Sequence, residues 1–293
     1  MTSDVEPWSS NSGSEGLSAT RFIDVRWTAE TGSTNADLME LAAKGHRGPM
    51  VLLTDHQTAG RGRQDRSWYD EPGDSLLVSV LVPADPAWAG LMPLVAGLAA
   101  LDGVDRFLGL DGSRSPVGLK WPNDVITTDG YDSKLAGILI EARSGGAVAS
   151  AGRPVTVVIG MGLNVRWSIE PPPEVRRRGI TLELLYARNS SETLPAAGRD
   201  QLLVAYLRAL DRWLDVVVRP DGVASVLAHY RQRCLTIGRT VSFATSTGTV
   251  VGTATGVGDG GELLVTDGDG RQHRLVAGDA HHQPLPRQAT DER

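Results

Sequence analysis

Apolar residues recur along the chain with two periods, which predict a series of buried strands and amphipathic helices. Continuous apolar runs of strand length are typical of strands buried on both faces. Such runs occupy residues 22–27, 50–55, 75–82, 118–126, 135–142 and 155–165. Apolar residues at helical spacing predict helices at residues 34–43, 91–101 and 200–218, the first with Ser33 or Thr34 as N-cap. Because predicted strands and predicted helices both occur along residues 22–218, we expect an α+β domain with a mixed sheet flanked by helices.

The pattern changes after about residue 235, where short alternating strands separated by glycines predict a small β-barrel. These strands are expected at residues 240–244, 249–255, 262–267 and 271–276. Gly256, Gly258 and Gly261 match a dinucleotide-binding fingerprint, but a strand follows them where that fold needs a helix, so they predict a hairpin turn. The expected division is a disordered tail at 1–20, a catalytic domain at 21–235, the barrel at 236–282 and a tail at 283–293.

Composition narrows the class of protein. The 293 residues are 41% hydrophobic, and no apolar run approaches the roughly 18 residues of a membrane span. The net charge of −6 argues against a broad nucleic-acid surface. The single cysteine, Cys234, cannot form an intramolecular disulfide, and no signal peptide precedes the first strand. We therefore expect a soluble, cytoplasmic protein that binds neither membrane nor nucleic acid, with no room before residue 22 for a DNA-binding module.

A glycine- and arginine-rich segment at residues 60–68 is the most specific feature of the chain. Arg61, Arg63 and Arg66 fall within six residues, and Gly60 and Gly62 let the backbone approach a ligand closely. The segment has no hydrophobic period and is expected to be a mobile anion-binding loop. Taken alone, it fits a solvated basic turn equally well.

Four further motifs place polar side chains at the ends of predicted elements. They are Gly32-Ser33-Thr34-Asn35, Lys120-Trp121-Pro122-Asn123-Asp124, Lys134-Leu135-Ala136-Gly137-Ile138 and Gly160-Met161-Gly162-Leu163-Asn164-Val165. A lysine, an amide and a carboxylate at a strand end can contact a nucleotide and its metal, and hydroxyls at a helix start suit a polar ligand. Each motif alone is also compatible with helix capping, an ordinary strand exit or close strand packing.

Together, these motifs resemble the biotin-protein ligases in order and spacing. The resemblance covers residues 22–165 well, the helix at 200–218 weakly, and the C-terminal region by pattern. It implies a class II synthetase-like (biotin-lipoate ligase-like) catalytic domain followed by an SH3-like barrel. It also implies a ligase-only member, because the winged helix of the repressor members is missing ahead of the first strand.

The resemblance implies the following roles. Biotin would contact Ser33, Thr34, Asn35, Gln57, Gly60, Arg61, Arg63 and Lys134. ATP would contact Arg63, Arg66, Trp68, Lys120, Trp121, Asn123 and Asn164. Arg63, Arg66 and Lys134 would act on the phosphates and the reacting carboxylate, and Asp124 would be the ligand of Mg²⁺.

The expected reaction is therefore the activation of biotin by Mg-ATP to biotinyl-5'-AMP and pyrophosphate. Transfer of biotin to a lysine of a biotin carboxyl carrier protein, of the acetyl-CoA carboxylase type, would follow. Two alternatives remain at this point. One is a lipoate-protein ligase, which the loop at 60–68 and the motif at 120–124 argue against, and the other is a non-enzymatic regulator that holds biotinyl-AMP.

Overall fold

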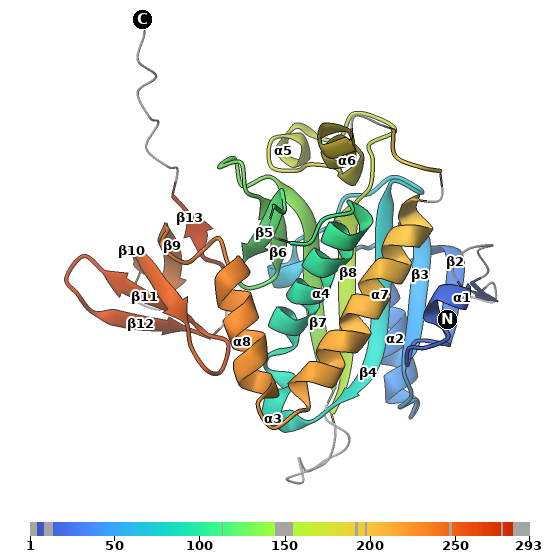
Figure 1. Ribbon diagram of the computed structural model, residues 1–293, viewed down its shortest axis with the longest axis horizontal. Helices are drawn as coiled ribbons and strands as arrows, with labels where there is room; N and C mark the ends of the chain where they lie inside the picture. The colour runs from blue at the N-terminus through green and yellow to red at the C-terminus, as the bar shows by residue number, and fades with distance from the viewer. Residues whose placement is uncertain are drawn as a thin grey trace, which may run out of the picture.

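The computed structural model describes residues 5–8, 14–112, 114–143, 155–190, 193–196, 198–245, 248–276 and 278–283. Its centre is an eight-stranded sheet (Figure 1). In spatial order the strands are β1 (Glu6–Pro7), β2 (Val25–Thr31), β3 (Met50–Gln57), β4 (Ser75–Ala84), β8 (Val155–Asn164), β7 (Lys134–Arg143), β6 (Asp124–Thr127) and β5 (Val117–Lys120). Only β2 and β3 pair in parallel, so the sheet is mixed, as the sequence predicts.

Helices cover both faces of this sheet. They are α1 (Ser14–Leu17), α2 (Thr34–Ala43), α3 (Pro86–Ala89), α4 (Met92–Phe107), α5 (Pro173–Arg176), α6 (Leu182–Ser190), α7 (Gly198–Val217) and α8 (Gly222–Arg233). Helices α4 and α7 lie together on one face (Figure 1), and a Cβ at Gly103 would be only 3.0 Å from the Tyr206 Cα. Helix α2 packs on the opposite face through Leu38 and Ala42. Burial from both sides explains the continuous apolar runs in the central strands.

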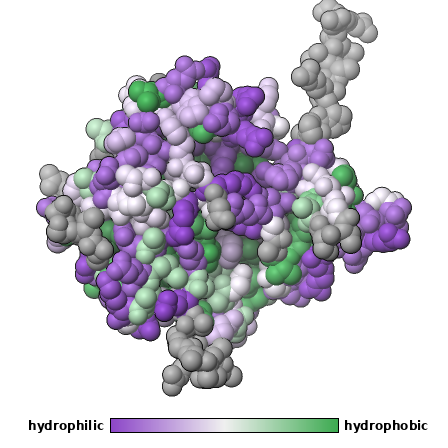
Figure 2. All heavy atoms as spheres, turned by 180° about the vertical axis from the view of Figure 1, so that it is seen from behind, coloured by the Kyte–Doolittle hydropathy of each residue, from purple (hydrophilic) through white to green (hydrophobic). Residues whose placement is uncertain are grey.

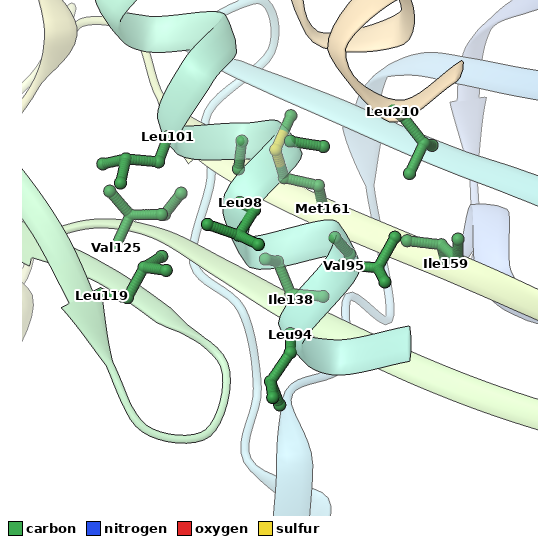
Figure 3. Close-up of a cluster of buried hydrophobic side chains, with 14 of the residues drawn as sticks. Leu94, Val95, Leu98, Leu101, Leu119, Val125, Ile138, Ile159, Met161 and Leu210 are labelled. Atoms are coloured by element: carbon green, nitrogen blue, oxygen red, sulfur yellow. The ribbon is translucent and has the colours of Figure 1, made fainter. Parts of the chain in front are cut away.

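The main core lies between α4 and the sheet. Leu94, Val95, Leu98 and Leu101 recur at helical spacing on α4 and are all buried. Figure 3 shows them facing side chains of β5 to β8, among them Ile138. Truncating a buried leucine of this kind typically costs about 2–5 kcal/mol. This packing holds β5 to β8 in place from one side of the sheet, and the polar motifs lie on the other side.

A second, five-stranded antiparallel sheet follows α8. Its spatial order is β12 (Gln272–Leu275), β11 (Leu263–Asp267), β10 (Gly248–Val257), β9 (Thr240–Thr245) and β13 (His281–His282). Gly258 N donates to the Glu262 carbonyl, and Gly261 has φ +85°, so these glycines form the expected hairpin turn. Trp121 Nε1 donates to the Gly261 carbonyl at 2.9 Å, which attaches this sheet to the large one.

Three expectations differ from the structure. Residues 118–126 form a hairpin of β5 and β6 and not one strand, because the chain turns at Trp121-Pro122 and Lys120 pairs with Asp124. Helices α6 and α8 are additional to the elements expected from the sequence. Helix α6 buries only Leu182 and Leu185, whereas α8 carries Val223, Val226, Leu227 and Tyr230 at helical spacing, a signal that the sequence offered. Within the expected N-terminal tail, Glu6–Pro7 pairs with β2, and Leu17 is buried in the core; residues 1–4 and 9–13 lie outside the described residues.

No helix of the described residues is both long and apolar enough to cross a bilayer.

Candidate functional site

A cavity of about 960 Å³ lies on the face of the large sheet opposite α4 and α7. Figure 2 views the molecule from this side and shows a hollow bordered by hydrophilic side chains. Its wall combines the start of α2, the loop at 60–68, strands β4, β7 and β8, the turn at 120–124 and the segment at 279–283. Every site residue predicted from the sequence lines this cavity except Gly60 and Asn164.

One end of the cavity is a network of buried neutral polar groups. Gln57 Oε1 accepts from Thr34 N at 2.9 Å, and the Thr34 hydroxyl oxygen is 2.7 Å from that of Ser79. Ser79 in turn donates to Asn35 Oδ1 at 2.6 Å. Ser33, at the N-cap position, is buried beside them and makes no capping hydrogen bond with its side chain. A ligand with both donors and acceptors fits this end.

Glu141 extends the network to the loop at 60–68. Its carboxylate accepts from Asn35 Nδ2 at 2.8 Å and from Arg61 Nη2 at 3.2 Å. Gly160 permits this arrangement, since a Cβ there would be 2.2 Å from Asn35 Oδ1. The carboxylate thus joins the start of α2 to the loop, and it fixes which way the Asn35 amide points.

The ring of Trp68 lies flat on the floor of the cavity. A Cβ at Gly162 would be 2.6 Å from the indole, and one at Gly137 would be 3.1 Å from it. Lys134 Nζ is 5.5 Å from the ring centroid, within the range of a cation–π contact. Trp68 Nε1 is buried and has no hydrogen-bond partner among the described residues. An unpartnered buried donor of this kind suits a ligand that supplies an acceptor.

The other end of the cavity is cationic. Arg63 donates to Asn123 Oδ1 at 3.1 Å and to the Gly278 carbonyl at 3.0 Å. Asp279 forms ion pairs with Arg63 and Arg66. Burial lowers the pKa of the Arg63 guanidinium, opposed by the charge of Asp124. An arginine nevertheless stays charged in proteins, so this end attracts anions.

Lysines add to this charge. Lys134 Nζ is 2.8 Å from Asp124 Oδ1, and both side chains face the cavity. Burial lowers the pKa of Lys120, against the charges of Asp124 and Asp132, which raise it. In all, eight lysines and arginines but only three carboxylates line the cavity of a chain whose net charge is −6. The positive charge is therefore concentrated at one place.

A buried His–Asp pair joins the C-terminal sheet to the cavity wall. His282 Nδ1 is 2.9 Å from Asp132 Oδ2, and its Nε2 is 2.9 Å from Thr236 Oγ1. Arg239 also donates to Asp132. Burial alone would raise the pKa of Asp132, but the hydrogen bond and charge of His282 and the charges of Arg239 and Lys120 outweigh it, so the pKa is lowered.

Three of the residues predicted to contact a ligand have side chains or backbone held in other contacts. Asn164 Nδ2 donates to the carbonyls of Lys134 and Ile180, so its side chain lies behind the cavity wall and the predicted adenosine contact is not supported. Trp121 is 2% exposed, with its indole bound to the C-terminal sheet. Gly60 lies under Trp68, whose carbonyl oxygen would be 3.2 Å from a Cβ at that glycine.

Sequence reasoning missed several polar residues that line or support the site. They are Ser79, Tyr131, Asp132, Glu141, Arg177, Arg178, Arg239, Asp279, His281, His282 and Gln283. Most belong to loops or to the C-terminal sheet, where no motif marks them. Ser79 and Glu141 had one signal, because each interrupts a strand that is otherwise largely apolar.

Comparison with known families gives two matches. The profile of the biotin/lipoate A/B protein ligase family matches residues 27–164, and that of the biotin protein ligase C-terminal domain matches residues 236–282.

Individual proteins agree with the family matches. The chain is 37% identical to a biotin--[acetyl-CoA-carboxylase] ligase of Mycobacterium tuberculosis (strain ATCC 25618 / H37Rv), over 89% of each chain. It is 31% identical to the Paracoccus denitrificans protein of the same description, over 83% of this chain and 95% of that one. Among solved structures, the biotin protein ligase from Aquifex aeolicus in complex with biotin and ATP has a similar fold. It shows a TM-score of 0.67 and 23% identity, and the match covers 89% of this chain and 99% of that one.

Proposed function

The chain belongs to the biotin protein ligases of the biotin/lipoate A/B protein ligase family, and on that basis we propose that it is an ATP-dependent, AMP-forming biotin ligase. It forms biotinyl-5'-AMP and pyrophosphate, and then transfers the biotinyl group to a lysine of a biotin carboxyl carrier protein. One observation carries the proposal: a single cavity joins a neutral polar end to a cationic end. The ureido ring of biotin is neutral and polar, and the triphosphate of ATP is anionic, so each ligand matches one end.

Biotin occupies the neutral end in this proposal. Its ureido ring has donors and acceptors that match the groups of Ser33, Thr34 and Gln57. Asn35 supports this end through its bonds to Ser79 and Glu141. The loop at 60–68 then covers the ligand, with Gly60 and Arg61 on the biotin side.

ATP occupies the cationic end. Trp68 and Asn123 contact the nucleotide side, while Arg63, Arg66, Lys120 and Lys134 surround the phosphates. Trp121 and Asn164 act indirectly in this scheme, because their side chains hold the C-terminal sheet and the Lys134 backbone in place.

The chemistry follows from this distribution of charge. An oxygen of the biotin carboxylate attacks the α-phosphorus, the bond from that phosphorus to the bridging oxygen breaks, and pyrophosphate leaves with the electron pair. Two anions must approach within bonding distance, which Coulomb repulsion opposes most strongly away from water. Arg63, Arg66 and Lys134 reduce that repulsion and stabilise the charge that develops on the leaving group. No protein nucleophile is needed.

The residues also fit a magnesium ion. The described residues contain no cluster of three or more His, Cys, Asp or Glu side chains that would hold a metal on their own. Mg²⁺ typically binds through one or two carboxylates together with phosphates and water, and the Asp124 carboxylate faces the phosphate end of the cavity. When bound there, Mg²⁺ would neutralise phosphate charge.

The loop has a second role in the proposal. A mixed anhydride is open to hydrolysis, so the loop at 60–68 protects it from water once biotin is bound. The carrier lysine, in its neutral form, then attacks the acyl carbon, and AMP leaves.

We also propose that the two sheets belong to two domains with different roles. Residues 21–235 form the catalytic domain, and residues 236–282 form a supporting domain that completes the cavity wall through Asp279 and His282.

The test uses the pure chain with biotin and Mg-ATP but no carrier. Mass spectrometry should detect biotinyl-AMP, and a coupled assay should detect pyrophosphate in equal amount. Lipoate is the matched control, and adenylate formed with lipoate alone would assign the chain to the lipoate branch. Binding of biotin and ATP without adenylate formation would identify it as a non-enzymatic binding protein.

A further inference from the structure

Two arginines of the cavity wall, Arg177 and Arg178, have no role in the proposed contacts with biotin and ATP. Arg177 and Arg178 follow α5 and line the cavity together with Lys120. Both side chains are exposed, and neither guanidinium takes part in an ion pair within the described part of the chain. Two adjacent charges without a carboxylate partner, facing a cavity that already holds excess positive charge, indicate a site for a polyanion.

The backbone holds this segment firmly against the site. Lys134 N donates to the Arg178 carbonyl at 2.6 Å, and Ile180 N donates to the Lys134 carbonyl at 3.0 Å. Gly179 N donates to the Val175 carbonyl at 2.7 Å, and a Cβ at Gly179 would be 2.9 Å from that oxygen. The segment at 177–180 is therefore fixed beside Lys134. The backbone of Arg178 takes part in this pairing directly, because its carbonyl accepts from Lys134 N.

The pKa shifts of neighbouring groups agree with a position of Arg178 close to Lys120 and His281. The charge of Arg178 contributes to lowering the pKa of both Lys120 and His281, after the larger effect of burial on each. Arg63 and Arg66 are instead partly neutralised by Asp279. Among the lysines and arginines that line the cavity, Lys120, Arg177 and Arg178 are thus the ones that form no ion pair within the described residues.

We propose that Arg177 and Arg178, together with Lys120, form the subsite for the β- and γ-phosphates of ATP and for the pyrophosphate that leaves. This inference rests on the proposed function, because it takes ATP as the substrate of the cavity. Arg63, Arg66 and Lys134 remain at the reacting α-phosphate and the carboxylate. Separate sets of cations for the reacting centre and the leaving group allow the leaving group to be held while its charge develops.

The experiment compares the full chain with Arg177→Gln and Arg178→Gln. Arg176→Gln is the matched control, because Arg176 is adjacent in sequence but does not line the cavity and is paired with Glu170. Calorimetry measures the binding of pyrophosphate, of ATP and of AMP to each protein, and it requires no turnover. Steady-state assays measure the KM for biotin and the KM for the carrier protein.

Each test variant should weaken binding of pyrophosphate and ATP by about five- to tenfold, since it removes one charge-assisted contact. AMP binding and the KM for biotin should stay within about twofold, and Arg176→Gln should behave as the parent chain.

Two results would overturn the inference. The first is unchanged pyrophosphate and ATP binding in both test variants, while the parent chain still forms biotinyl-AMP. The second is a raised KM for the carrier protein with unchanged ATP binding, which would place the arginines at the carrier. Failure of the proposed function itself is recognised separately, by a parent chain that forms no biotinyl-AMP.

Discussion

The indole ring of Trp68 rests on Gly162, with 2.6 Å between the ring and the place where a Cβ would stand. Strand β8 can carry only glycine there, because the ring is rigid and lies over the backbone.

We therefore predict that Gly162→Ala displaces Trp68 from the floor of the cavity. Since Trp68 is assigned to the nucleotide side, the KM for ATP in adenylate formation should rise about tenfold or more, with a smaller change in the KM for biotin. Gly90→Ala is the control, because a Cβ at Gly90 meets nothing within 4 Å. Equal kinetics for both variants would show that the ring does not contact ATP.

Arg63 joins the loop at 60–68 to Asn123 and to Gly278 of the C-terminal segment. Arg63→Gly removes both contacts and one positive charge, so biotinyl-AMP should dissociate at least about tenfold faster. A filter-binding measurement of the dissociation rate of the intermediate checks this. Arg271→Gly, which alters an exposed arginine paired with Asp269, should leave the rate unchanged. The assignment is wrong if the two variants release the adenylate equally slowly.

Glu141 holds both Asn35 and Arg61. Glu141→Gln keeps the size but removes the charge, so the hold on Arg61 weakens and the Asn35 amide is free to turn. We expect the KM for biotin to rise about tenfold, with a KM for ATP within about twofold of the parent value. Glu174→Gln, in the first turn of α5, serves as the control. A change confined to the KM for ATP would contradict the biotin-side assignment.

The Asp132–His282 pair predicts a pH dependence of stability. The pKa of Asp132 is lowered in the folded chain, so its contribution is complete above the unfolded value of about 4 and is lost as the pH falls through the lowered folded value. Urea unfolding from pH 7 to pH 3 should show the free energy of unfolding of the parent chain approaching that of Asp132→Asn below about pH 4. Asp259→Asn, at a 97% exposed carboxylate, is the control. A constant gap between parent and Asp132→Asn across this range would rule out the pairing.

Much of the fold could be predicted because the signal is local. The strands at 50–57 and 75–84 are buried from both sides over most of their length, so they carry apolar runs at 50–53, 76–78 and 80–82. Helix α4 shows its buried face at every turn. The sequence predicts one strand where the structure has the hairpin at 117–127, since both of its strands are largely apolar and only Trp121, Pro122 and Asn123 separate them. Helix α8 could also have been predicted, because Val223, Val226, Leu227 and Tyr230 recur at helical spacing and pack on the core.

The chemistry of the site could be predicted from short contiguous segments of the chain. Glycines and arginines at 60–68, the strand-end motif at 120–124 and the helix start at 33–35 are contiguous motifs, and the resemblance they carry was enough to predict the reaction. The other side chains that complete the cavity come together through the packing of distant segments. Asp279 and His282 reach it from the C-terminal sheet, and Glu141 from the far end of β7. The physical reason is distance along the chain: these groups meet through packing and strand pairing, and no periodicity or spacing in the sequence records such contacts.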